Sequence, residues 1–201
     1  LGTSYAAPVA NNEFSYSIRL PRSIKSGRHE LGFFVNDSYG NTGSASAEFS
    51  VQAVPTKIVN TLSEQSIKPL EEFVLSVSIY DQADDLLKSD VDIEIKDSSG
   101  VLILSASNLT DSNSTLSFPE HQKPGSYMLV SSGLGLSASS QLVVEEVEAG
   151  SVRFDNSTIT LINIGNVKYA RQFNISMFGR KSYVVVHDVD LAPGEAFKVD
   201  L

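Results

Sequence analysis

The alternation of apolar and polar residues through the middle of the chain constrains its fold more than any other feature. The apolar positions of the two clearest runs are Phe73, Leu75, Val77 and Ile79, then Val91, Ile93 and Ile95. Successive side chains of a β-strand point to opposite faces, so each run can bury one face and expose the other. Turn-forming sequences such as DQADD, DSSG and KPG separate the runs. The pattern predicts an antiparallel β-sandwich over residues 55–148.

The length and composition are typical of an ordered protein with its own hydrophobic cores. The chain has 201 residues, of which 41% are hydrophobic and 19% are charged, which is too apolar for a disordered chain. No run of about 18 apolar residues occurs, so no membrane-spanning helix is predicted. The chain starts abruptly and without a signal peptide, so we expect a longer parent protein and a membrane anchor, if any, outside this sequence.

Two residue types are absent. The chain has no cysteine, which excludes disulfides and thiolate metal sites and favours a prokaryotic surface protein, archaeal or bacterial, over a secreted eukaryotic one. It also has no tryptophan, which argues against an antibody-type core and against a carbohydrate-binding module built on a flat aromatic platform.

Acidic residues are concentrated in the middle of the chain. Residues 55–148 contain fifteen acidic and five basic residues, whereas residues 1–54 contain four of each and residues 149–201 contain five acidic and six basic residues. The net charge of −9 therefore arises in the middle segment. Such a surface repels phosphate backbones, and no basic stripe with interleaved aromatic residues offsets it, so nucleic-acid binding is not expected.

The flanking segments carry the same alternation in shorter form. Strands are predicted at Phe14–Leu20, Glu30–Asn36 and Ser44–Val51, and at Val152–Asp155, Thr158–Ile164, Arg171–Phe178, Tyr183–Val189 and Ala196–Leu201. In the turn NDSYGNTG, Gly40 and Asn41 can adopt positive φ at little cost. An Ig-like sandwich needs about seven strands. We therefore expect a partial module over residues 1–54, a complete one over 55–148 and a partial one over 149–201.

Short motifs resemble surface modules of prokaryotes. The D-x-x-G-N hairpin at Asp37–Asn41 is similar to the end of bacterial Ig-like repeats. The series S-I-K-P-x-E-x-F-x-L-x-V-x-I-x-D (Ser66–Asp81) with P-G-S-Y-M-L (Pro124–Leu129) resembles macroglobulin-type and invasin-type Ig-like domains. The pieces L-I-N-I-G-N-V-x-Y (Leu161–Tyr169) and L-A-P-G-E (Leu191–Glu195) look like surface-layer or adhesion-type domains. These resemblances imply tandem extracellular Ig-like modules that act as spacers or binding modules without an active site.

Five N-x-S/T sequons are candidate glycosylation sites: Asn36, Asn108, Asn113, Asn156 and Asn174. Roughly four or five such triplets occur by chance in a Ser- and Asn-rich chain of this length. Four of them fall at predicted turns or strand ends, where a glycan could project into solvent, and Asn174 is usable only if its side chain points outward. The alternative is ordinary polar turn residues, and the intact mass of the native protein distinguishes the two.

Acidic residues and histidines are the candidate metal ligands of this chain. The turn containing Asp81, Asp84 and Asp85, with Asp90 nearby, could supply oxygen ligands to calcium, but it lacks EF-hand spacing and the glycine of such a loop. A solvated acidic turn is favoured. The histidines His29, His121 and His187 lie in three different segments without metal-ligand spacing. We therefore predict surface or strand-edge histidines, no metal and no cofactor.

The opening G-T-S-Y-A-A-P resembles the block around the nucleophilic serine of subtilisin-like proteases, with Ser4 in that role. In that family the serine opens a long buried helix, whereas here Asn11, Asn12 and the alternating E-F-S-Y-S-I-R-L-P follow. The other triad members would have to precede this chain. No second Ser/His/Asp set, P-loop or dinucleotide motif occurs. Asp188 and Asp190 share one face of a predicted strand, which is the usual arrangement of acidic residues on a solvent-exposed face. No catalytic residue is predicted.

These features together predict a non-catalytic extracellular structural or adhesive module of a cell-surface protein, in a surface layer, a filament or an ectodomain stalk. Its expected partners are other protein chains, including copies that complete the partial modules by strand addition. The alternative is a set of accessory binding domains of a secreted hydrolase such as a subtilisin-like protease.

Overall fold

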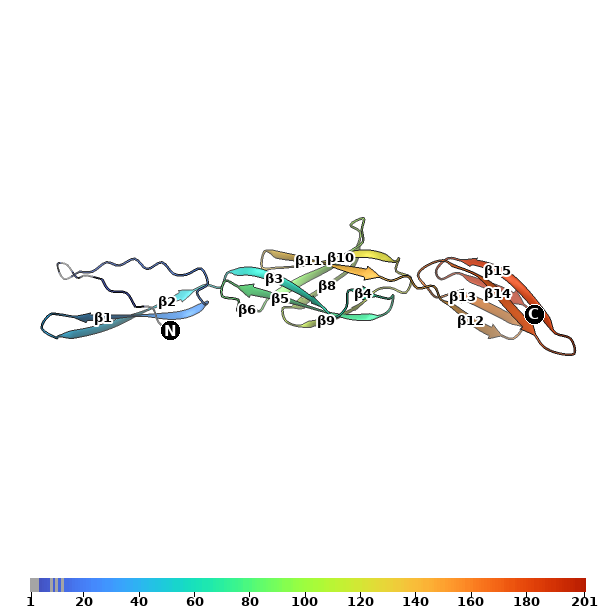
Figure 1. Ribbon diagram of the computed structural model, residues 1–201, viewed down its shortest axis with the longest axis horizontal. Helices are drawn as coiled ribbons and strands as arrows, with labels where there is room; N and C mark the ends of the chain where they lie inside the picture. The colour runs from blue at the N-terminus through green and yellow to red at the C-terminus, as the bar shows by residue number, and fades with distance from the viewer. Residues whose placement is uncertain (1–3, 8, 10, 12) are drawn as a thin grey trace. The chain divides into compact units, whose positions relative to one another are not determined.

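The computed structural model describes residues 4–7, 9, 11 and 13–201, and every regular element among them is a β-strand (Figure 1). The hairpins between consecutive strands are antiparallel, so the predicted all-β class is confirmed. In the described residues, no helix is long and apolar enough to cross a membrane. The chain forms two compact units, residues 1–54 with 80–85, and residues 55–79 with 86–201. The first unit thus takes residues 80–85 from the segment after residue 54, and residue 148 lies inside the second unit.

Within residues 13–54, all of them described, the strands form one antiparallel hairpin. Strands β1 (Gly27–Asn36) and β2 (Thr42–Val51) pair from Gly27 opposite Val51 to Asn36 opposite Thr42. The partly buried side chains of β1 alternate along the strand, at His29, Leu31 and Phe33. One face of the hairpin is therefore half-covered and the other is exposed.

One strand prediction for this unit is wrong. Residues 14–20, predicted as a strand, form no ladder, although the ring of Phe14 lies 5.9 Å from that of Phe33. Alternation marks which side chains can be buried, but a strand also needs a neighbouring edge with which to pair. In the turn, Gly40 has a φ of 87°, but Asn41 is not at positive φ. Asn41 instead donates its side-chain amide to the Asp37 carboxylate at 2.6 Å.

The middle of the chain is a two-sheet sandwich. One sheet has the order β4-β11-β10-β7-β8, and the other contains β3, β5, β6 and β9. The strands are β3 (Pro55–Leu62), β4 (Ser66–Ile67), β5 (Glu72–Asp81), β6 (Leu86–Leu87), β7 (Asp90–Lys96), β8 (Leu102–Leu109), β9 (Asn113–Ser117), β10 (Gly125–Gly133) and β11 (Leu136–Val144). Strand β4 pairs in parallel with β11.

The core of this sandwich is formed by the alternating residues that the sequence singles out. All seven predicted inward positions of β5 and β7 are buried. They pack in one cluster with further residues of the five-stranded sheet, including Ile67, Leu129, Leu142 and Val144. An aromatic group adds to this cluster, since the ring of Phe118 lies 5.1 Å from that of Tyr127. Burying such side chains stabilises the fold by about 1.5–3 kcal/mol each.

The last segment contains two smaller sheets. Strands β12 (Gly150–Asp155), β13 (Thr158–Asn163) and β16 (Ala196–Asp200) form one, and β14 (Tyr169–Met177) and β15 (Tyr183–Leu191) form the other. The predicted strand ends agree with these bounds to within two residues. The buried cluster is small: Leu161, Val189 and Leu191, with Tyr169, Phe173 and Phe197 packed against it.

Candidate functional site: an asparagine junction

A five-residue linker, Glu145–Ala149, connects β11 to β12, and hydrogen bonds hold it at alternate residues. The Glu145 N–H donates to the Ile67 carbonyl at 3.0 Å. The carbonyl of Val147 accepts the Asn166 backbone N–H at 2.9 Å, and the Ala149 carbonyl accepts the N–H of Ile164, the residue after β13, at 2.9 Å. The linker is therefore part of the hydrogen-bonded structure.

Asn166 is the centre of this junction, and it is only 4% exposed. Its Nδ2 donates to the carbonyls of Glu145, at 2.7 Å, and Gln122, at 3.0 Å. Its Oδ1 accepts the Val147 N–H at 2.7 Å. An amide side chain supplies both donors and acceptors from one group, which is what three backbone groups of mixed polarity need. One side chain thus ties the linker to the loop that precedes β10.

Asn163 is fully buried three residues earlier. Its Nδ2 donates to the carbonyls of Val167, at 2.8 Å, and Leu191, at 2.9 Å. Its backbone N–H donates to the Glu195 carbonyl at 2.9 Å, and its carbonyl accepts the Gly194 N–H at 2.9 Å. The N-x-G-N and A-P-G-E turns noted in the sequence are therefore bound directly to each other.

Gly165 lies between these two asparagines and makes a close backbone approach. A Cβ added there would lie 2.0 Å from the Val147 carbonyl oxygen, so a side chain does not fit. The Gly165 carbonyl lies 2.8 Å from Nδ1 of His121. Because a carbonyl can only accept, Nδ1 carries the hydrogen in this contact. His121 is thus a partly buried member of the junction.

The other two histidines lie elsewhere. His29 is partly buried on β1, stacks on Phe49 with ring centroids 5.3 Å apart, and has Nε2 2.8 Å from the Lys25 carbonyl. His187 on β15 packs against Phe197 at 5.1 Å. Across the described residues, no group of three or more His, Asp or Glu side chains is placed to hold a metal ion.

Ion pairs flank the junction at the surface. Arg171 lies 2.6 Å from Glu148 of the linker, and Lys168 lies 2.7 Å from Asp190. Solvent-exposed pairs of this kind contribute about 0–1 kcal/mol. The buried amides therefore contribute more to holding the linker than these charges do.

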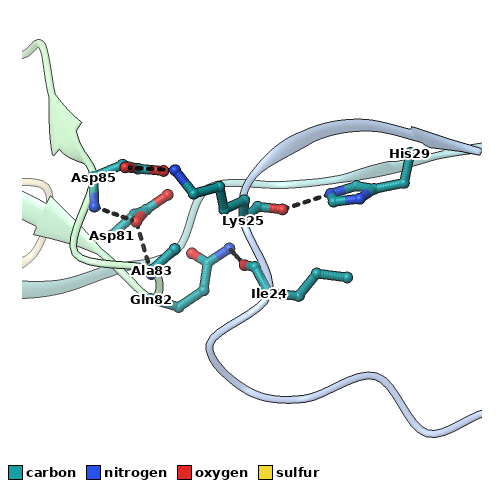
Figure 2. A network of polar contacts seen from close by, with 7 residues as sticks. All are labelled: Ile24, Lys25, His29, Asp81, Gln82, Ala83 and Asp85. Carbon is teal, nitrogen blue, oxygen red and sulfur yellow. Dashed lines mark hydrogen bonds and ion pairs between the residues drawn. The ribbon is translucent and has the colours of Figure 1, made fainter. Parts of the chain in front are cut away.

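The acidic turn considered for calcium is a network within the first unit (Figure 2). Lys25 Nζ lies 3.4 Å from Asp85 Oδ1, and the Lys25 carbonyl lies 2.8 Å from a ring nitrogen of His29. Gln82 donates its side-chain amide to the Ile24 carbonyl at 3.1 Å. At least one carboxylate of this turn is thus paired with a cation of the protein.

Asp81 is buried and organises the turn with its own carboxylate. Its Oδ1 accepts the backbone N–H groups of Ala83, at 2.8 Å, and Asp85, at 3.0 Å. Burial raises the pKa of Asp81, whereas these two hydrogen bonds lower it. With the Ser26 hydroxyl and the charge of Lys25, they hold the pKa below its ordinary value.

The same five-residue turn occurs three times, at Asp37–Asn41, Asp81–Asp85 and Asp97–Val101. In each, the first carboxylate accepts the N–H groups of the third and fifth residues, and the first N–H donates to the fifth carbonyl. The fourth residue has a φ of 87°, 61° and 86° in chain order. This is a hairpin turn closed by an aspartate, so these acids have a structural use.

Hydrogen bonds lower the pKa of the other two turn aspartates as well. The side chain of Asn41, with its backbone N–H, lowers the pKa of Asp37. The Ser99 hydroxyl, with the Val101 N–H, lowers the pKa of Asp97. In each turn the ionised carboxylate is the better acceptor.

The five sequon asparagines differ in their accessibility. Asn36, Asn113, Asn156 and Asn174 are exposed. Asn174 lies on the outward face of β14, opposite Val186, so it meets the condition set for it. Asn108 is partly buried, and its Nδ2 donates to the Ser114 hydroxyl at 2.7 Å. Since a glycan would be attached at that nitrogen, Asn108 is the least suited of the five.

The described part of the protease-like block, around Ser4, is not helical. Ser4–Ala7 are irregular and Ser4 is exposed, while Gly2, Thr3 and Pro8 of the block lie outside the described residues. The local structure therefore differs from the helix that such a nucleophile opens.

A surface hollow of about 550 Å³ lies on the five-stranded sheet. It is lined by Lys96, Asp97, Ser98, Gly100, Ser126, Tyr127, Met128, Ser139, Ser140 and Gln141. This lining includes neither a histidine nor a sequon asparagine.

Comparisons with known proteins add little to this site. No protein-family model and no curated protein matches the chain. It is similar to the structure of dimeric latent PorU from Porphyromonas gingivalis, with 18% identity over 60% of this chain and 12% of that chain, and a TM-score of 0.31. It is also similar to E. coli alpha-2-macroglobulin in its native conformation, with 10% identity over 87% of this chain and 14% of that chain, and a TM-score of 0.33. The chain thus spans a small part of either protein, and similarity at this level supports no inference about function.

Proposed function

We propose that this chain is a non-catalytic structural part of an extracellular cell-surface protein, in which consecutive β-sandwich modules form a spacer. The observation that carries the proposal is the junction around Asn166. Modules within one chain move against each other unless their interface holds them. Here a buried amide with three hydrogen bonds ties the linker Glu145–Ala149 in place.

A linker held in this way suits a spacer. Each buried hydrogen bond contributes about 0.5–1.5 kcal/mol, and breaking one partner leaves a desolvated group that costs about 1–3 kcal/mol. Bending the chain at the linker would break several of these bonds together. A binding domain tethered for reach would instead favour a Gly/Ser-rich linker.

Assembly with further chains belongs to the same proposal. Strand β12 lies at the edge of its three-stranded sheet and exposes Val152 and Phe154. An exposed edge with apolar side chains can accept a strand from another chain. Light scattering that shows a strict monomer at all concentrations would argue against this part.

Because the chain lacks cysteine, spin labels attach only to cysteines introduced at chosen positions. Cysteines at the exposed positions Ser105, on β8, and Ser157, in the β12–β13 turn, report the distance across the junction by double electron–electron resonance. We expect a narrow distance distribution, broadened in Asn166→Ala and unchanged in the control Asn113→Ala. A broad distribution in the labelled wild-type chain would refute the spacer role.

A further inference from the structure

The tip of the β14–β15 hairpin exposes large apolar side chains. Phe178 in its turn is 85% exposed, and Tyr183 and Val184 at the start of β15 are 57% and 63% exposed. Val186 is exposed too. These residues stand in contrast to Val189 further along β15, which is buried. The end of the hairpin therefore extends past the core of its own segment.

The same tip is cationic. Residues 156–187 contain no Asp or Glu and four Lys or Arg residues, in a chain with a net charge of −9. Lys168 pairs with Asp190 of β15, and Arg171 pairs with Glu148 of the linker. Among the described residues, Arg180 and Lys181 of the turn form no ion pair. Two uncompensated positive charges thus lie between Phe178 and Tyr183 in the sequence.

The apolar side chains of the tip do not form one flat face. Alternation along β15 places Tyr183 on the inward row, with Val189, and Val184 on the outward row, and Phe178 lies in the turn between the strands. A shaped protein surface accommodates one face of a hairpin, whereas a lipid interface accommodates apolar groups on all sides. The outward apolar row ends at the charged residue Asp188, so only the tip of the hairpin can enter a lipid interface.

We propose that the tip of the β14–β15 hairpin, residues 177–184, docks on an anionic lipid surface. Phe178 and Tyr183 enter the boundary between headgroups and acyl chains, where amphipathic and aromatic side chains reside. Arg180 and Lys181 bind the lipid phosphates. This contact uses side chains alone and adds to any anchor outside the sequence, and it does not depend on the proposed spacer role.

The absence of tryptophan allows a direct test. In Phe178→Trp, the single tryptophan reports the tip, and Phe34→Trp is the matched control. Phe34 lies at the end of the β1–β2 hairpin and is 88% exposed, but that turn carries Asp37 in place of cations. We expect a blue shift of the tryptophan emission with Phe178→Trp, but not Phe34→Trp, on vesicles of phosphatidylcholine with phosphatidylserine. Vesicles of phosphatidylcholine alone should give a smaller shift.

Removal of the positive charges tests whether Arg180 and Lys181 bind the lipid phosphates. Sedimentation with the same anionic vesicles should show about fivefold weaker binding in Arg180→Ser and again in Lys181→Ser, and binding should weaken with salt. Phe178→Ser should weaken binding as well, whereas Phe34→Ser should leave it unchanged. Circular dichroism confirms that each surface variant is folded. An equal shift for both tryptophans, binding that ignores the cations, or a concentration-dependent shift without vesicles would each overturn the proposal.

Discussion

The middle sandwich and the last segment are built from the same alternating sequence, yet their interiors differ. The middle has thirteen buried apolar residues in one cluster, shared by two opposed sheets, and the last segment has three. Alternation produces strands with one apolar face in both. A large core requires extensive sheets on both sides, and the middle has sheets of five and four strands, whereas the last segment has sheets of three and two.

The last segment relies more on buried polar groups. Asn163 and Asn166 are both buried and hydrogen-bonded, and they bind turns and linker where side-chain packing is sparse. Low dielectric strengthens such bonds and makes their loss expensive. The comparison therefore suggests that one region is stabilised mainly by apolar packing and the other to a greater degree by an amide network.

Core truncation should give the largest difference between the two regions. Leu129 and Leu161 are buried leucines at the two cores. We expect Leu129→Ala to lower the free energy of unfolding by about 4 kcal/mol and Leu161→Ala by about 2–3 kcal/mol, because the sparser site can collapse around the cavity. Urea unfolding followed by circular dichroism measures both. Equal losses would show that the two cores are packed alike.

Removal of the junction amide should come next. Asn166→Ala leaves the Val147 N–H and two carbonyls without their partner, so we expect a loss of about 2–3 kcal/mol, measured by urea unfolding. Asn113→Ala, at an exposed asparagine, should stay within about 0.5 kcal/mol of wild type. If Asn166→Ala matched this control, the junction would add nothing to stability.

Acid should have the smallest effect, and it should act on the middle and the first unit. The pKa values of Asp37, Asp81 and Asp97 are lowered on folding. A carboxyl group whose pKa is lower in the folded protein stabilises the fold at pH values above the pKa of the unfolded chain, about 4. This stabilisation is lost as the pH falls through the pKa of the folded protein. The urea midpoint of wild type should therefore fall in acid, with a shallower fall in Asp97→Asn.

Ser99→Ala provides a graded test of the same turn. It removes the hydroxyl that contributes most to lowering the pKa of Asp97. Its pH dependence should lie between those of wild type and Asp97→Asn. A steeper dependence in either variant would contradict the assigned role of the turn.

The sequence alone determined most of the strands, the inward positions and most of the turns. Periodicity in Phe73–Ile79 and turn chemistry at Asp97–Gly100 depend on residues that are neighbours in the chain, so they can be read locally. For the same reason the five strands of the last segment were predicted to within two residues. The candidate glycosylation sites were also visible as triplets, although their accessibility was not.

Only the tertiary structure decided what those elements contact. Residues 14–20 alternate like the other strands but find no ladder. Asn166 has the sequence context of a polar turn residue, yet its hydrogen-bond partners lie 19 to 44 residues away. His121 and its partner Gly165 are likewise 44 residues apart. Hydrogen bonds over such separations arise from packing of distant segments, and no local pattern encodes them. The strands are therefore a property of the sequence, and the junction is a property of the fold.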